Sequence, residues 1–138
     1  MKKALALVLA LLIMTAVAMA KPALQPFPRT LINARYVYVT SYDGDQFNSN
    51  LWPEDRRAIA AVQNAIQNWG RYIVVYKPAD ADMILVVQSR PSEDILAVYD
   101  ARMPGASYLW RAMGRGGLEQ GEIPLFTELR HAVEKASK

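Results

Sequence analysis

The sequence feature that most constrains the fold is a short apolar run from Ala81 to Val87. It is bounded by Lys77-Pro78 on one side and by Arg90-Pro91 on the other. A run this short and this rich in branched side chains is typical of a strand buried on both faces, whereas a buried helix needs a longer segment. We therefore predict that residues 81–88 form a central strand of a small sheet.

The first twenty residues have the pattern of a secretory signal peptide. Lys2-Lys3 forms a charged start, residues 4–17 are apolar, and Ala18-Met19-Ala20 is a small-x-small cleavage site. The alternative is an uncleaved membrane anchor, although a span needs at least about seventeen residues and alanine inserts weakly. We predict a signal peptide at residues 1–20 and a periplasmic or secreted mature protein.

Charge and cysteine content limit the possible partners. The chain has sixteen basic and thirteen acidic residues, and removal of Lys2 and Lys3 leaves a net charge of +1. A charge this close to zero argues against a nucleic-acid partner, and we expect membrane contact only through the signal peptide before its cleavage. Because the chain has no cysteine, disulfides, thiolate metal sites and cysteine nucleophiles are excluded. We predict no cofactor.

Residues 21–34 are rich in proline, with Pro22, Pro26 and Pro28 close together. Proline at this density favours extended chain, so we predict an arm at 21–34 that leads into a single domain at 35–138. Three apolar side chains could let part of this arm lie against the domain: Phe27, Leu31 and Ile32.

The clearest helix is predicted to begin at Pro53, whose fixed φ suits the first helical position. Its apolar residues recur at steps of three and four, which places them on one face: Ile59, Val62, Ile66 and Trp69. Gly70 follows where a left-handed C-terminal cap is expected.

The remaining segments complete an α+β fold. Alternation predicts strands at 35–42, 71–76, 94–100 and 107–115 besides the central run, and Pro124 begins a second amphipathic helix. We predict the order β-α-β-β-β-β-α, as a single sheet of about five strands with two helices packed on one face.

Several short motifs follow this layout. They are Tyr36-Val37-Tyr38-Val39, Trp69-Gly70-Arg71-Tyr72, Ala81-Asp82-Met83-Ile84-Leu85-Val86 and Tyr108-Leu109-Trp110-Arg111. In this arrangement the chain resembles small uncharacterised exported α+β domains of bacterial envelopes. More loosely, it is similar to the amino-terminal domain of the TolB translocation protein and to lipoprotein activators of peptidoglycan synthases. The resemblance implies a non-enzymatic binding or assembly role and carries over no site. The chain departs from it in lacking a lipidation cysteine.

Tyrosines form the candidate binding set. If both helices cover the face that holds Val37, Val39, Ile73 and Val75, alternation places four tyrosines on the opposite face: Tyr36, Tyr38, Tyr72 and Tyr76. An aromatic face beside an aliphatic stripe has the composition of a binding surface. The alternative is that tyrosine simply forms strands well and tolerates water.

Asp43-Gly44-Asp45 is the candidate metal site, because alternate aspartates in a loop can supply oxygens to a hard cation. The same residues also end strands through ordinary turn chemistry. If the strands on either side of the first helix are parallel, Asp80 and Asp82 would return near this loop and could complete a calcium site. The single histidine, His131, has no neighbouring nucleophile or carboxylate pattern and is read as a surface residue of the last helix.

These observations favour an exported cell-envelope protein that acts as a non-enzymatic binding or scaffold domain, whose partner is an envelope protein or a second copy of the chain. The alternative is a small hydrolase or metal-dependent enzyme that uses the Asp43/Asp45 edge.

We predict that the precursor is cleaved after Ala20, because the charged start, the apolar stretch and the cleavage motif stand in the order that signal peptidase requires. Mass spectrometry of the exported protein measures the new N-terminus. An exported protein that retains Met1 would show that the segment is an anchor instead.

Overall fold

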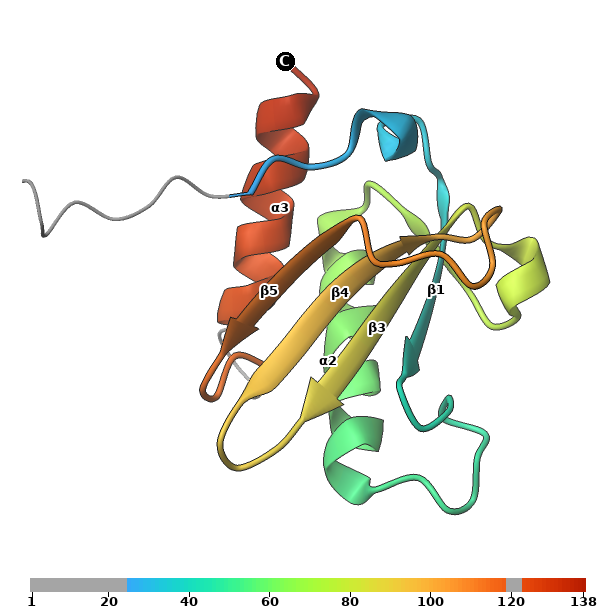
Figure 1. Cartoon of the computed structure of the whole chain (residues 1–138), viewed down its shortest axis with the longest axis vertical. Coiled ribbons are helices and arrows are strands. Elements are labelled where there is room, and N and C mark those ends of the chain that lie inside the picture. The colour runs from blue at the N-terminus through green and yellow to red at the C-terminus, as the bar shows by residue number, and fades with distance from the viewer. Residues whose placement is uncertain (1–24, 119–122) are drawn as a thin grey trace, which may run out of the picture.

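The computed structural model describes residues 25–118 and 123–138, which form one mixed sheet backed by two helices (Figure 1). In chain order the elements are η1 (Arg29–Leu31), β1 (Tyr36–Ser41), α2 (Pro53–Trp69), β2 (Ile73–Val75), η2 (Pro78–Asp80), β3 (Met83–Ser89), β4 (Asp94–Asp100), β5 (Trp110–Gly114) and α3 (Pro124–Ala136). The predicted α+β class and the predicted order of strands and helices are both confirmed. The predicted signal peptide lies outside the described residues.

The sheet has the strand order β2-β1-β3-β4-β5. β1 is parallel to both β2 and β3, whereas β4 is antiparallel to β3 and to β5. The predicted central strand is therefore the middle strand. Its residues Met83, Leu85 and Val87 are at most 1% exposed, and Val86 on the other face is 8% exposed. The apolar run is thus buried on both faces, as its composition indicates.

α2 begins and ends as the sequence predicts. Pro53 is its first residue, and Glu54 and Asp55 lie in the first turn, where the helix dipole favours negative charge. Gly70 has φ 78°, and its N–H donates to the carbonyl of Ile66 at 3.1 Å, which satisfies one of the last free carbonyls of the helix.

Both helices pack on the same face of the sheet and enclose a single core (Figure 1). α2 contributes Ile59, Val62 and Ile66, which are fully buried, and α3 contributes Leu129 and Val133. The alternation of each strand sends every second side chain into this core and leaves the others on a face that we call the open face.

Part of the predicted arm belongs to the domain. Phe27 and Leu31 are 3% and 1% exposed and join the core, so the packed structure begins before residue 35. The segment is also fixed by the indole N–H of Trp110, which donates to the carbonyl of Gln25 at 3.1 Å. The free energy gained by burying two large apolar side chains explains why this proline-rich segment packs against the domain instead of forming a separate extended arm.

β2 is shorter than the predicted strand, and its side chains lie on the opposite faces of the sheet from those predicted. In its register with β1, Ile73 lies opposite Tyr36, Val74 opposite Val37, and Val75 opposite Tyr38. Val74 therefore packs toward the core, and Ile73 and Val75 lie on the open face, which is the reverse of the facing predicted from alternation over residues 71–76.

We predict that Leu85→Ala lowers the free energy of unfolding by about 2–5 kcal/mol, because a fully buried leucine leaves a cavity when it is truncated. Urea denaturation at constant m-value measures the change. Val86→Ala is the neighbouring comparison, and we expect a smaller loss because fewer atoms are removed from a face without a helix. Unchanged midpoints in both variants would contradict the position of β3 at the centre of the sheet.

Candidate binding face of the sheet

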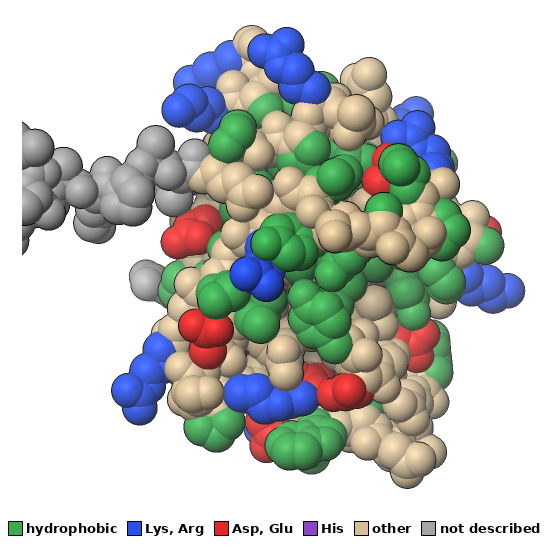
Figure 2. Space-filling model, in the orientation of Figure 1, with side chains coloured by type: hydrophobic (Ala, Val, Ile, Leu, Met, Phe, Trp, Pro, Cys, Tyr) green, Lys and Arg blue, Asp and Glu red, His purple; other side chains and the backbone are tan. Residues whose placement is uncertain are grey.

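The open face carries a band of large side chains that no described helix covers. Every second side chain of four strands lies on this face, in register from strand to strand: those of β1, β3, β4 and β5. Toward the β5 side these residues are Val86, Ile95, Ala97, Tyr99, Leu109, Arg111 and Met113. Figure 2 shows this face, where hydrophobic side chains gather at its centre around a basic group.

Three tyrosines and an arginine form a cluster on this face, which we call the aromatic cluster: Tyr42, Tyr99, Tyr108 and Arg111. The guanidinium carbon of Arg111 lies 4.6 Å from the centre of the Tyr108 ring, a cation–π geometry. Tyr42 continues the alternation of β1. Although Tyr42 is 46% exposed, partial burial of its hydroxyl and the neighbouring Tyr99 raise the pKa of Tyr42 to about 12.

A shallow apolar groove adjoins the cluster on the same face. Its volume is about 400 Å³, and it lies between η2 and the loop at residues 101–106. Ile84 and Val86 form its floor, and Tyr99 lines it as well, so the groove and the aromatic cluster are continuous.

The four tyrosines predicted from the sequence do not all share this face. Tyr36 is 40% exposed and lies on the open face at the start of β1. Tyr76 is 48% exposed, but β2 ends at Val75, so Tyr76 lies outside the strand whose alternation was to place it on this face. Tyr38 is on the open face but only 8% exposed, and its hydroxyl donates to Oδ2 of Asp45 at 2.6 Å. Burial and this hydrogen bond raise the pKa of Tyr38.

Tyr72 lies in the core, so its predicted place on the open face is wrong. It precedes β2, it is 5% exposed, and its ring meets that of Trp69 edge-to-face at 5.4 Å between centroids. Because β2 starts at Ile73 with that residue on the open face, the preceding side chain turns toward the helices. Burial raises the pKa of the Tyr72 hydroxyl, which has no hydrogen-bond partner among the described residues.

The two aspartates of the candidate metal site are each engaged by donors from the chain. Asp45 accepts from the hydroxyl of Tyr38 and, through Oδ1, from the backbone N–H of Phe47 at 3.0 Å. Oδ2 of Asp43 pairs with the guanidinium of Arg90 at 3.2 Å. The described residues contain no group of three or more histidine or acidic side chains that could hold a metal ion.

Asp80 and Asp82 do not return to this loop. β1 and β2 are parallel as predicted, but β3 is also parallel to β1, so the chain must come back to the amino end of β1 before β3 begins. There Oδ2 of Asp82 accepts from the backbone N–H groups of Arg35 and Tyr36 at 2.9 and 3.1 Å, and these hydrogen bonds lower the pKa of Asp82. The predicted approach of four carboxylates is therefore wrong.

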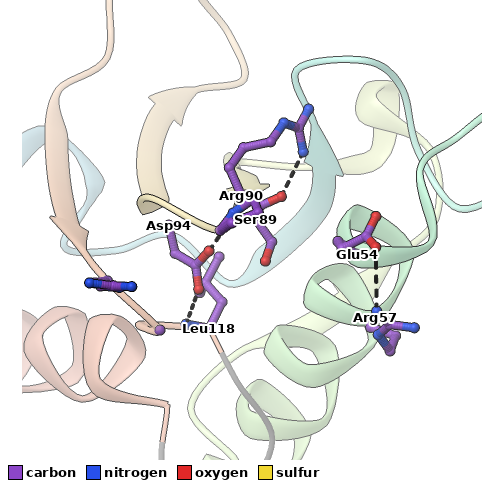
Figure 3. Close-up of a pocket in the computed structure, with 9 residues that line it drawn as sticks. Glu54, Arg57, Ser89, Arg90, Asp94 and Leu118 are labelled. Atoms are coloured by element: carbon purple, nitrogen blue, oxygen red, sulfur yellow. Dashed lines mark hydrogen bonds and ion pairs between the residues drawn. The ribbon is translucent and has the colours of Figure 1, made fainter.

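A polar cluster joins the start of α2 to the turn between β3 and β4. Oδ1 of Asp55, a residue only 1% exposed, accepts from the Arg90 guanidinium and from the Ser89 N–H, both at 2.9 Å. The buried Asp94 accepts from the backbone N–H groups of Arg90 and Leu118, and lines a cavity of about 550 Å³ (Figure 3). Because these carboxylates accept from donors that fix the turn, we assign them a structural role.

Sequence reasoning missed all four members of the aromatic cluster as site residues: Tyr42, Tyr99, Tyr108 and Arg111. The signal for Tyr99 was present, because alternation from Asp94 to Asp100 places it on the face opposite Leu96 and Val98. Tyr108 and Arg111 depend on where β5 begins, which alternation alone does not fix. His131 is exposed on α3, as predicted.

Comparison of the chain with protein-family models, with curated proteins and with solved structures finds no match. In residues 25–118 and 123–138, neither helix combines the length and the apolar character that crossing a membrane requires.

We predict that Tyr42 makes stability decrease as the pH rises from about 10 to about 12. An unfolded phenol loses its proton near pH 10, whereas the folded Tyr42 holds its proton until about pH 12. The unfolded state is therefore favoured progressively across this window. Denaturation at several pH values, together with tyrosinate absorbance, measures the effect, and Tyr42→Phe should reduce both the pH slope and the late absorbance change.

Tyr36→Phe serves as the control, because it removes a tyrosine hydroxyl at the start of β1, whereas Tyr42 follows the last residue of that strand and belongs to the aromatic cluster. If Tyr42→Phe behaves like this control in both measurements, Tyr42 does not lie against Tyr99 as described.

Proposed function

We propose that this protein is an exported cell-envelope protein with a non-enzymatic role, and that it binds or scaffolds a partner through the aromatic cluster and groove of the open face. The observation that carries the proposal is the uncovered sheet face. Tyr42, Tyr108, Leu109 and Met113 each expose between 37% and 46% of their side chains there. Large, rigid aromatic side chains of this kind recur at contact surfaces because they bury much area at little cost in side-chain entropy.

The chemistry of the face favours a partner surface that is apolar around an acidic group. Arg111 stands among apolar and aromatic side chains, stacked on Tyr108, and has no carboxylate partner among the described residues. A planar guanidinium that is already ordered by stacking can receive a carboxylate with two hydrogen bonds. Arginine and tyrosine together are typical of the residues that dominate binding energy in protein interfaces.

The proposed location in the cell envelope is supported by the signal-peptide pattern of residues 1–20 and by the resemblance to exported envelope domains. The alternative enzyme at the Asp43/Asp45 edge gains no support from the geometry, because the carboxylates are directed to Arg90, Tyr38 and a backbone N–H rather than toward a shared site.

We predict that the double change Tyr42→Ser and Tyr108→Ser leaves the domain folded but weakens partner retention from native envelope extract. An ordinary contact tyrosine contributes about 1 kcal/mol, so the two changes together should lower affinity roughly thirtyfold. Retention on the immobilised protein and the thermal midpoint are measured on the same preparation.

The matched control is Phe47→Ser with Trp52→Ser, two aromatic side chains that are 69% and 55% exposed on the connection between β1 and α2. The control should retain the partner. A Tyr42/Tyr108 variant that is less stable but, while folded, retains every partner of the wild type would refute a binding role for the face and favour a purely structural role for its tyrosines.

A further inference from the structure

A second surface lies at the end of the molecule where α3 terminates. A cleft of about 320 Å³ runs between the segment at residues 25–29 and the C-terminal half of α3. Its floor is apolar and is formed by Phe27, Ala132 and Ala136. None of these residues belongs to the open face of the sheet.

The rim of this cleft is basic. Four side chains that can carry positive charge line it, and all of them are exposed: Arg29, His131, Lys135 and Lys138. None of the four forms an ion pair with a described residue. The helix dipole explains why α3 has cations near its C-terminus, but Arg29 comes from η1 and converges on the same cleft independently.

The acidic residue nearest in sequence is directed mainly to a cation outside the rim. Glu134 pairs with Arg130 at 2.9 Å on the same helix. A further cation, Arg71, reaches this end through a hydrogen bond from its guanidinium to Oγ of Ser137 at 2.8 Å. Figure 2 shows Lys and Arg side chains together at this end of the molecule, with no acidic side chain among them in that view.

The chain enters the described domain at the same place. Gln25 and Pro26 line the cleft, and the apolar segment at residues 4–17 precedes Gln25 by only eight residues, a reach of at most about 30 Å. In the alternative in which that segment is retained as an anchor, this basic end is held near the membrane surface.

We propose that the cleft binds the anionic headgroup of a membrane phospholipid. The cationic rim meets the phosphate, and the apolar floor accommodates the uncharged part of the lipid beside it. This proposal departs from the expectation that membrane contact is confined to the signal peptide, which was drawn from the near-neutral total charge. Attraction to an anionic surface depends on charges within about one Debye length of it, and those are the basic residues of this end. The lipid contact would leave the aromatic cluster free to bind a partner, because Tyr42, Tyr99, Tyr108 and Arg111 do not line the cleft.

The test uses the chain beginning at Lys21, which contains every described element and the whole core. Co-sedimentation compares vesicles of phosphatidylcholine alone with vesicles of phosphatidylcholine and phosphatidylglycerol in equal parts. We expect binding to the mixed vesicles only, decreasing as salt is added. Arg29→Gln, Lys135→Gln and Lys138→Gln together should weaken it about a hundredfold, because each basic residue near an anionic surface contributes about 1 kcal/mol.

The matched control removes the same charge elsewhere, through Arg57→Gln, Lys77→Gln and Arg115→Gln, three exposed residues that do not line the cleft. This control should retain most of the binding, and both variants should keep the thermal midpoint of the wild type. Equal loss in the two variants, or equal binding to both kinds of vesicle, would overturn the proposal. Saturable binding of inorganic phosphate in the absence of vesicles, or tighter binding to a single-stranded oligonucleotide, would also overturn it.

Discussion

The two-sided burial of β3 is the constraint on which the structure depends. β3 pairs in parallel with β1 and antiparallel with β4, so it joins the two halves of the sheet. Its residues Met83, Leu85 and Val87 face the core, where β3 packs against α2, while Ile84 and Val86 form the floor of the groove on the other side. Because two helices are enough to cover only one face of a five-stranded sheet, the second face is left to side chains and short loops.

The open face follows from this arrangement. Val86 is 8% exposed without a helix above it, because larger side chains such as Tyr99 stand beside it across the strands. Arg111 and Tyr108 extend the same surface toward β5. The surface therefore combines a buried aliphatic floor with exposed aromatic and cationic groups, which is the composition that we assign to partner binding.

Much of the fold could be predicted because each main element carries its own signal. Pro53 and Gly70 mark the ends of α2, and the apolar run marks β3. The facing of the side chains of β2 and its register with β1 were harder to predict, because a strand of three residues is positioned by the strands and loops beside it. Tyr72 looked like a strand residue, but β2 begins after it, and the side chain enters the core. The place of Asp82 depended on a second parallel pairing that local patterns do not encode.

The sequence predicted the type of candidate site but only some of the residues that form it. The sequence indicated an aromatic sheet face, and Tyr38 lies on it, yet the exposed cluster is built mainly from Tyr42, Tyr99 and Tyr108. Which tyrosines meet depends on the order β2-β1-β3-β4-β5, and strand order is a property of the whole fold. The basic cleft was missed for a related reason, because Arg29 and α3 are distant in sequence and meet only when residues 25–34 pack against the domain.

The most direct test of the central claim is site-specific photo-crosslinking in the native envelope. A benzophenone side chain is placed at Tyr108 on the open face, and a second variant carries it at Asn68, an exposed position on the helix side. If the open face is the binding surface, Tyr108 yields a discrete crosslinked product, to a partner or to a second copy of the chain, and Asn68 does not. No product from Tyr108, or the same products from both positions, would contradict the account.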